Sequence, residues 1–328
     1  MNIYEFAKEV GLSIGTVSRA INGRKGVSAS TRETVLRKME ELGFRPSRTA
    51  ASLATGRTRM VALWTPGLAS GYVNAILVQL ECILEADDFD LAVVDVERKR
   101  EDSARLLDLA RWPVDGILAL DAVDWLGPVA RERPVPLVSF GVHAYCRGID
   151  HVVVELGEGA EQAVEHLVAE GCRRVAMTVP SSYNIPGRAR RDAYVRAVER
   201  HGFAPEFIET SSLVPAQAVQ VVRDYIGAHG HPDGLFCFND DLGIATYRGL
   251  RDLGVRVPED VLLVGCDGVE ETRYLDPPLA TIEVPIHEMC ATAWGFLRSR
   301  IVDPALAPRS ARFSARFLPR PSAERPRV

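Results

Sequence analysis

The feature that most constrains the fold is an alternation of short apolar runs with amphipathic stretches between residues 60 and 284. The apolar runs have the length of buried strands, and most of the stretches between them carry apolar residues at helical spacing. This alternation predicts parallel sheets with helices on both faces. Strands are expected at 60–64, 91–96, 116–120, 137–140, 151–156, 174–179, 235–238, 262–266 and 280–284, and helices near 71–86, 102–111, 157–170, 187–201, 215–229 and 240–253.

The number of strands predicts two lobes. Nine strands over this length are more than one small sheet needs, so each lobe is expected to contain its own parallel sheet. Parallel sheets bind ligands at the carboxyl ends of their strands, and two such sheets offer a site between them. The fold class expected for this part of the chain is therefore α/β, doubly wound and two-lobed.

Residues 1–45 have a different pattern, with three short helices separated by glycines. The first helix carries Ile3, Phe6, Ala7 and Val10 and ends at Gly11, and the second follows Ser13 and buries Val17, Ala20 and Ile21. The third follows Ser28, has a capping-box spacing at Ser30 and Glu33, and carries Val35, Leu36, Met39 and Leu42 before Gly43. Two short helices joined by a tight turn, with a third to complete the core, predict a helix-turn-helix unit.

In such a unit the second helix enters the major groove, and its N-terminal residues lie nearest the bases: Ile14, Gly15, Thr16, Ser18 and Arg19. Arg19 is suited to the two acceptors of guanine, Ile14 to a thymine methyl group, and Gly15 to close approach. Asn22, Ser28 and Thr31 are short donors suited to phosphates. Periodicity alone leaves a purely structural three-helix module equally open.

Charge separates the two parts of the chain. The formal net charge is −5, which by itself argues against a polyanionic partner. Residues 1–58, however, contain ten Lys or Arg and five Asp or Glu, a charge of +5, whereas the remaining residues carry −10. This asymmetry favours nucleic-acid binding by the N-terminal part.

Residues 46–58 have the composition of a hinge. Pro46 ends the preceding helix, Ser47 can cap a new one, and Gly56 ends it. A helix over 47–55 is too short to be stable alone and should form only when packed against another surface. Leu53 is its single large apolar side chain. Two interpretations remain, a linker whose leucine docks on the next domain, or a helix that folds on DNA and inserts Leu53 into the minor groove.

Four N-terminal segments, in order and without gaps, resemble the headpiece of the lactose-repressor (LacI/GalR) family of bacterial transcription regulators: GLSIGTVSRAIN (11–22), VSASTR (27–32), GFRP (43–46) and AASL (50–53). The resemblance implies base reading by Ile14, Gly15 and Arg19, and backbone contacts by Thr16, Ser18, Asn22, Ser28 and Thr31. It also places Ala50 and Leu53 in the minor groove. The expected DNA interface further includes Tyr4, Ser13, Ser47 and Arg48.

C-terminal segments resemble the same family: PDGLFCFND (232–240), GVRVP (254–258), VGCD (264–267), PLATI (278–282) and LPRPS (318–322). The resemblance implies a periplasmic-binding-protein-like fold whose lobes are joined near 152–156, 282–286 and 312–319. The expected domains are a headpiece at 1–45, a hinge at 46–58 and a two-lobed effector-binding and dimerisation domain at 59–328. Lobe 1 is expected at about 59–153 and 286–313, and lobe 2 at about 154–284 and 316–322.

Pocket positions carried over from the resemblance are Arg190, Asn239, Asp267, Trp64, Tyr72 and Phe140. A carboxylate, an amide, a guanidinium and aromatic rings suit a small polyol. Five of them have a structural alternative: helix capping for Asn239 and Asp267, an ion pair for Arg190, and core packing for Trp64 and Tyr72. The sequence departs from sugar-binding relatives at Gly141, Ala193, Glu155, Cys266 and Ala280, which puts a simple sugar effector in doubt.

Other functional classes lack their motifs. The glycines at 157 and 159 are followed by Gln162 and flanked by glutamates, which disfavours a dinucleotide site, and no hydrolase, P-loop or zinc-protease motif occurs. Six dispersed cysteines indicate reduced thiols in the cytoplasm. We therefore expect that the protein is not an enzyme and that it has no cofactor, metal or membrane association.

The expected partners are operator DNA, a small-molecule effector and a second copy of the chain. The C-terminal residues have no leucine heptad, so we expect a dimer and not a tetramer. A transport-type binding protein is the alternative, which predicts a signal peptide and no headpiece.

Overall fold

The computed structural model describes residues 1–326 except 22, 24, 45–56, 98–101, 122–125, 133, 134, 143–147 and 187. These residues form two compact units, 1–59 with 113–115, and 60–112 with 116–328. Within the described part of the chain, no helix combines the length and apolar character needed to cross a membrane.

The N-terminal unit contains three helices, α1 (Ile3–Glu9), α2 (Ile14–Ile21) and α3 (Ala29–Glu41). Asn2 and Glu5 form a capping box at the start of α1, because the Asn2 side chain accepts from the backbone of Glu5 and the Glu5 side chain accepts from that of Asn2. Positive φ angles at Gly11 and Gly43 end α1 and α3, as the sequence predicts. The core consists of Phe6, Ala7, Val17, Ala20, Val35 and Phe44.

Two details of this unit differ from the prediction. The cap of α3 is Ser28, whose hydroxyl accepts from the backbone of Thr31, so the predicted box of Ser30 and Glu33 is wrong. Leu36 and Leu42 are exposed to 44% and 36% instead of completing the core stripe. Phe44, which follows α3, stacks on Phe6 with ring centroids 4.3 Å apart and fills that space.

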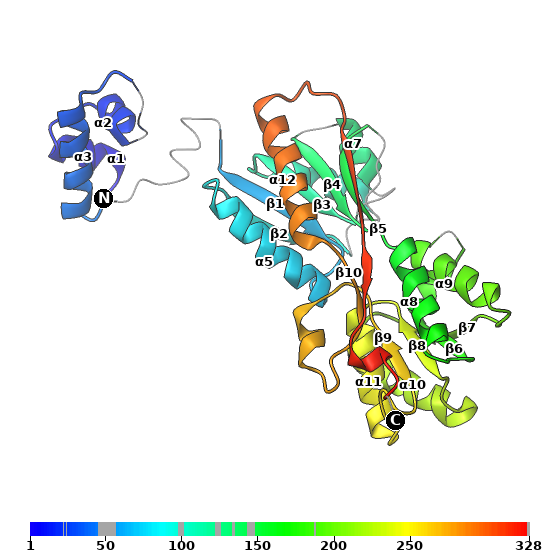
Figure 1. Ribbon diagram of the computed structural model, residues 1–328. Helices are drawn as coiled ribbons and strands as arrows, with labels where there is room; N and C mark the ends of the chain where they lie inside the picture. The colour runs from blue at the N-terminus through cyan, green and yellow to red at the C-terminus, as the bar shows by residue number, and fades with distance from the viewer. Residues whose placement is uncertain are drawn as a thin grey trace. The chain divides into compact units, whose positions relative to one another are not determined.

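Lobe 1 is built on a six-stranded parallel sheet in the order β11-β5-β4-β3-β1-β2 (Figure 1). Its strands are β1 (Met60–Thr65), β2 (Asp90–Asp95), β3 (Gly116–Leu120), β4 (Leu137–Gly141), β5 (Asp150–Glu155) and β11 (Ser310–Ser314). Every residue of β3 and β4 is buried, so both faces of the sheet are covered. Its helices are α5 (Gly71–Glu85), α6 (Ser103–Ala110), α7 (Gly127–Glu132) and α12 (Ile286–Val302), of which α5 and α12 pack together.

Lobe 2 is built on a four-stranded parallel sheet in the order β7-β6-β8-β9. Its strands are β6 (Val175–Pro180), β7 (Glu206–Thr210), β8 (Gly234–Cys237) and β9 (Leu262–Val264). Its helices are α8 (Gly157–Ala169), α9 (Ala189–Arg200), α10 (Pro215–His229) and α11 (Asp240–Asp252), with short 3₁₀ turns η2 (Ser181–Tyr183), η3 (Glu270–Tyr274) and η4 (Pro321–Ala323). Ligand-binding positions after β8 and β9 therefore share one edge of the sheet.

The chain passes between the two parallel sheets three times. It leaves β5 for α8 at 155–157, and it returns at 283–286 between β10 (Thr281–Glu283) and α12. The third passage is at 314–316, between β11 and β12 (Arg316–Leu318). β10 and β12 pair antiparallel beside the two main sheets. Three adjacent crossing strands give the lobes a common set of connections about which they can close.

Five regular elements were not expected from the sequence: β7, β11, β12, α7 and α12. β11 and β12 are short and partly exposed. Polar residues alternate with apolar ones along β11, and β12 has only three residues, so neither contains a long apolar run. The residues that α12 buries include Met289, Cys290, Ala293, Trp294 and Leu297, on a helix that packs against both α5 and the sheet. These buried residues recur at helical spacing, so the sequence does carry the pattern of an amphipathic helix at this position.

Candidate functional site

The helix α2 is capped at its N-terminus and has an exposed face. The Ser13 hydroxyl accepts from the backbone N–H of Thr16 at 3.1 Å and pairs with the Thr16 hydroxyl at 2.9 Å, which satisfies the first turn. Val17 and Ala20 are buried against the other two helices. Ile14, Gly15 and Arg19 are exposed on the remaining surface, and Thr16 and Ser18 are half-buried.

The side chain of Arg19 lies close to Gly15 and Gly26. A Cβ atom at Gly15 would lie 3.8 Å from Arg19 Nη1, and one at Gly26 would lie 3.9 Å from Arg19 Cδ. The guanidinium therefore lies along the exposed face of α2, beside the helix position one turn before it. A guanidinium displayed this way suits the paired acceptors on the major-groove edge of guanine.

The N-terminus of α3 gathers three hydroxyl groups. The Ser28 hydroxyl lies 2.7 Å from that of Thr31 and 3.0 Å from that of Ser30, and no acidic residue stands in the first turn. A helix N-terminus with hydroxyl donors and no negative charge suits a phosphate group. Tyr4, on α1, is exposed to 70%.

The predicted DNA contacts at Asn22, Ser47, Arg48, Ala50 and Leu53 lie outside the described residues, as does the hinge helix expected at 47–55. Their roles, including the minor-groove insertion of Leu53, stay predictions. The described end of the linker begins at Arg57, and there the Asp115 carboxylate accepts from the backbone N–H groups of Thr58 and Arg59 at 2.7 and 3.1 Å.

In lobe 2, Arg190 is buried at the carboxyl end of the sheet. Its Nη1 donates to the carbonyl of Phe238 at 2.5 Å and lies 3.7 Å from Asp267 Oδ1. The guanidinium also stacks on the Phe238 ring, 3.7 Å from the centroid. Charge, hydrogen bonds and the aromatic face together hold one orientation of Arg190.

Asp267 follows β9 in a backbone conformation that favours glycine, with a φ of 130°. Its side chain is 6% exposed. Burial raises the pKa of Asp267 well above its ordinary value, Arg190 opposes the rise, and the carboxylates of Asp240, Asp241 and Asp121 add to it. A non-glycine residue held in this conformation stores strain of about 1–3 kcal/mol, which is frequent at ligand sites.

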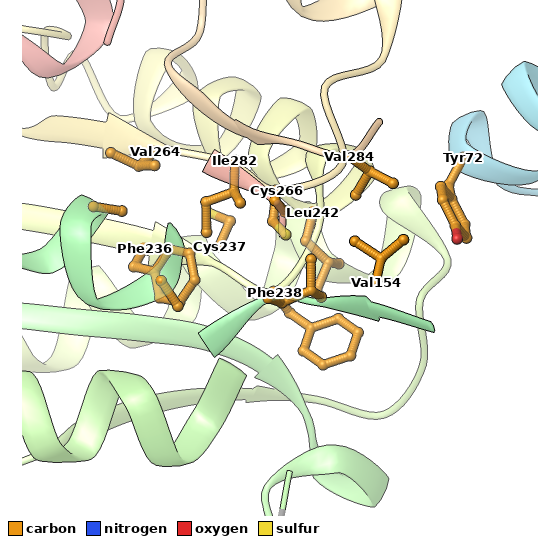
Figure 2. Close-up of a cluster of buried hydrophobic side chains, with 14 of the residues drawn as sticks. Tyr72, Val154, Phe236, Cys237, Phe238, Leu242, Val264, Cys266, Ile282 and Val284 are labelled. Atoms are coloured by element: carbon orange, nitrogen blue, oxygen red, sulfur yellow. The ribbon is translucent and has the colours of Figure 1, made fainter. Parts of the chain in front are cut away.

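The structure brings Tyr72 to the same place from lobe 1. Tyr72 belongs to the buried apolar cluster that contains Val154, Val284, Phe238 and Cys266 (Figure 2). Burial raises the pKa of Tyr72 well above its ordinary value, and the nearby carboxylates of Asp121 and Asp267 add to the rise. Arg190, Asp267 and Tyr72 thus meet in one electrostatic environment.

The other three predicted pocket residues have structural contacts. The Asn239 side chain caps α11 by accepting from the backbone N–H of Leu242 at 2.9 Å. Trp64 is 1% exposed within β1, and Phe140 is fully buried within β4. For Asn239 and Trp64 these are the capping and packing arrangements that the sequence left open as alternatives.

Sequence reasoning missed two aspartates that begin α11. Asp240 is fully buried and accepts from the Thr281 hydroxyl at 2.7 Å and from the backbone of Gly268 and Val269 at 2.7 and 2.9 Å. It thereby holds the loop that carries Asp267, and burial raises the pKa of Asp240 to about 6 despite these hydrogen bonds. The sequence feature that could have identified both residues is the pair of acidic residues directly after Asn239, at the end of a predicted strand.

Asp241 connects the two lobes. Its carboxylate oxygens lie 3.2 and 3.3 Å from the backbone N–H of Gly71, which donates to them. Gly71 begins α5, whose own N-cap residue, Ser70, makes no capping hydrogen bond. A Cβ at Gly71 would lie 3.2 Å from Asp241 Oδ1, so the glycine permits this approach. A carboxylate of lobe 2 therefore caps a helix of lobe 1.

Comparisons with known proteins agree with this arrangement. Residues 2–47 match the profile of bacterial regulatory proteins of the lacI family, and residues 164–323 match a periplasmic binding protein-like domain. The chain belongs to the LacI family. This LacI-family protein is 26% identical over 309 residues to the HTH-type transcriptional repressor PurR of Photobacterium profundum, with 92% of each chain covered.

Solved structures extend the similarity over the whole length. The cellobiose complex of the transcriptional regulator CelR is 27% identical to this LacI-family protein, with a TM-score of 0.68 and 98% and 99% of the two chains covered. The operator-bound lac repressor dimer shares the fold, with a TM-score of 0.84, 23% identity and 99% of each chain covered. The protein is a DNA-binding transcriptional regulator of the repressor family, with a helix-turn-helix headpiece and a periplasmic-binding-protein-like effector domain.

Proposed function

We propose that this regulator represses transcription by binding a two-fold-symmetric operator as a homodimer, under the control of a small-molecule effector between its lobes. The observation that carries the proposal is α2, a capped helix with Val17 and Ala20 buried and Arg19 on its exposed face. Such a helix offers its N-terminal residues to base edges in the major groove. This function needs neither a catalytic residue nor a cofactor, and it places the protein on DNA in the bacterial cytoplasm.

We place the site of the proposed effector at the region between the lobes where Arg190, Asp267 and Tyr72 lie close together. A guanidinium and a carboxylate 3.7 Å apart supply donors and acceptors, and the aromatic groups cover apolar faces of a ligand. The similarity to CelR, whose solved structure is a cellobiose complex, supports a ligand with several hydroxyl groups. An effector that favours one lobe arrangement would shift the population of dimers competent for DNA.

A first prediction concerns Arg19. The full-length protein should enrich a symmetric sequence from a random DNA library, because two headpieces related by a two-fold axis read two equivalent half-sites. Arg19→Ala should lower the preference for that site over unrelated DNA by about 10–100-fold, the range for one bidentate base contact. Fluorescence anisotropy on both DNAs measures the ratio.

Arg37→Ala is the matched control for Arg19. Arg37 lies on α3 and is paired with Glu41, so its removal takes away the same charge without touching α2. It should lower affinity for both DNAs alike and leave the preference unchanged. A library without an enriched sequence, or an Arg19→Ala protein with the preference of the wild type, contradicts the proposal.

A second prediction concerns the homodimer. Val78 on α5 is 57% exposed and Val93 on β2 is 43% exposed, although α5 and β2 contact each other and β2 is the edge strand of its sheet. Exposed valines on these adjoining elements favour a protein interface. The double variant Val78→Asp/Val93→Asp should sediment as a monomer at concentrations where the wild type is a dimer.

Val302→Asp is the control for dimerisation. Val302 is 71% exposed at the end of α12, outside α5 and β2, and its substitution should leave the sedimentation coefficient unchanged. A wild-type protein that sediments as a monomer, or a double variant that remains dimeric, would show that this surface does not form the dimer.

A further inference from the structure

In each lobe, an aspartate that precedes one strand binds the backbone just before the neighbouring strand. In lobe 1, Asp115 directly precedes β3, and its carboxylate accepts from the backbone N–H groups of Thr58 and Arg59, just before β1. The same carboxylate accepts from the Thr58 hydroxyl at 2.9 Å. Because β1 and β3 pair in parallel, with Val61 opposite Gly116, Asp115 lies beside the residues that enter β1.

Lobe 2 contains a matching arrangement. Asp233 directly precedes β8, and one oxygen of its carboxylate accepts from the backbone N–H groups of Arg173 and Arg174 at 2.8 and 2.9 Å. These two residues enter β6, which pairs in parallel with β8. Asp115 and Asp233 are both half-buried, and each is followed by a glycine that begins the strand. We call these arrangements the lobe 1 clamp (58, 59 and 115) and the lobe 2 clamp (173, 174 and 233).

The two clamps hold segments that precede their strands in different ways. The residues of the lobe 2 clamp follow α8, a helix of the same lobe, and in the described chain around this clamp neither Arg173 nor Arg174 has a positive φ. The residues of the lobe 1 clamp follow the linker. There Arg59 has a φ of 56°, in the left-handed region that side chains other than glycine enter at a cost. Asp115 therefore stabilises an unusual backbone conformation where the linker enters β1.

We propose that Asp115 is a positioning residue for DNA binding, because it fixes the point from which the linker of each subunit extends. The inference rests on the proposed function, the binding of a two-fold-symmetric operator by a homodimer. A fixed starting point limits the separation of half-sites that two headpieces can bind together. An extended residue spans about 3.3–3.6 Å, so release of Thr58 and Arg59 would add about 7 Å to each linker, roughly the length of two base pairs.

The experiment measures how strongly the full-length protein discriminates between half-site spacings. Fluorescence anisotropy gives its affinity for the symmetric site selected from the random library, and for the same half-sites moved apart by two base pairs. The ratio of these affinities is the spacing preference. Asp115→Ala removes the carboxylate of the lobe 1 clamp, and Thr58→Val removes only the hydroxyl hydrogen bond. Asp233→Ala, the matched control, removes the carboxylate of the lobe 2 clamp.

We expect the wild type to prefer the selected spacing by about 100-fold or more, since simultaneous binding of two linked headpieces adds affinity of that order. Asp115→Ala should reduce the spacing preference by about 10-fold, because longer linkers reach both spacings, and Thr58→Val should reduce it by a smaller factor. Both variants should keep the wild-type preference for the half-site sequence. Asp233→Ala should keep the spacing preference, even where loss of its clamp lowers the melting temperature.

Three results would overturn the inference: a wild-type spacing preference in Asp115→Ala, an equal loss of preference in Asp233→Ala, or equal binding of both spacings by the wild type. In each case the proposed function stands, provided that the library yields a symmetric site. A library without an enriched site contradicts both the proposed function and the inference. If circular dichroism shows Asp115→Ala to be unfolded, Thr58→Val decides: a reduced spacing preference supports the inference, and an unchanged one overturns it.

Discussion

Phe6→Ala should abolish specific DNA binding while leaving the two-lobed domain folded. Phe6 is fully buried, stacks on Phe44 and is one of the six buried core residues in the described part of this unit. Removing a buried phenylalanine costs about 3–5 kcal/mol. A unit of this size rarely has more than about 3–5 kcal/mol of stability, so the substitution should unfold it. Anisotropy should show an affinity for the selected site reduced to that for unrelated DNA.

Leu36→Ala provides the control in the same unit. Leu36 is 44% exposed on α3, outside the buried core, so truncating it should change neither folding nor DNA affinity by more than a few fold. Limited proteolysis should cleave the N-terminal unit of Phe6→Ala rapidly and spare that of Leu36→Ala. Retention of wild-type DNA affinity by Phe6→Ala would contradict the packing described for this unit.

Asp150→Asn should have the largest effect on the two-lobed domain. Asp150 is fully buried at the start of β5 and accepts from Arg300 at 2.9 and 3.0 Å and from the Arg309 side chain at 2.8 Å. Its substitution leaves Arg300, itself 7% exposed, without its counter-charge. Breaking a buried pair in this way costs about 3–5 kcal/mol, or roughly 5–9 °C in melting temperature for a domain of this size.

The pH dependence of this effect has a definite sign. Burial by itself raises the pKa of Asp150, but hydrogen bonds from Arg300 and Arg309 outweigh it and lower the pKa below its usual 3.8. The stabilisation is therefore fully present above pH 3.8 and is lost as the pH falls through the lowered value. The difference in melting temperature between wild type and Asp150→Asn should shrink in the same range.

Asp260→Asn is the comparison for the buried cluster. Asp260 forms an exposed pair with Arg256 four residues earlier, and exposed pairs contribute little because solvent screens them. Calorimetry should find its melting temperature unchanged. Equal melting temperatures for wild type and Asp150→Asn would show that the two arginines find other partners and that the cluster does not stabilise the domain.

Local patterns were sufficient for most elements of the fold. Each predicted strand and helix between residues 60 and 284 has a counterpart within a few residues of its expected position, because buried strands need continuous apolar runs. α12 was missed although the residues that it buries, among them Met289, Ala293 and Leu297, recur at helical spacing. β11 and β12 were missed since they are short and partly exposed, and their pairing depends on residues far away in the sequence.

The surroundings of Gly141, Asp240 and Asp241 illustrate what a single sequence does not reveal. From the sequence, Gly141 was interpreted as the loss of a polar side chain. Only the structure shows that the Asp121 carboxylate, from another strand end, occupies the space beside Gly141 that such a side chain would need. Asp240 and Asp241 adjoin the predicted Asn239, yet their roles depend on partners about 28 and 170 residues away, Gly268 and Gly71. Contacts of this range arise from chain topology and leave no local pattern.

The sequence by itself determined the family and the organisation of the chain: a basic helix-turn-helix followed by alternating strands and helices. These properties depend on local spacing, capping residues and charge, all of which act within a few residues. The tertiary structure alone decided which polar residues lie close to Arg190 and Asp267, because strand order brings together side chains that are distant in the sequence. It also decided that Asp241 caps a helix of the other lobe, a contact that exists only once both sheets have formed.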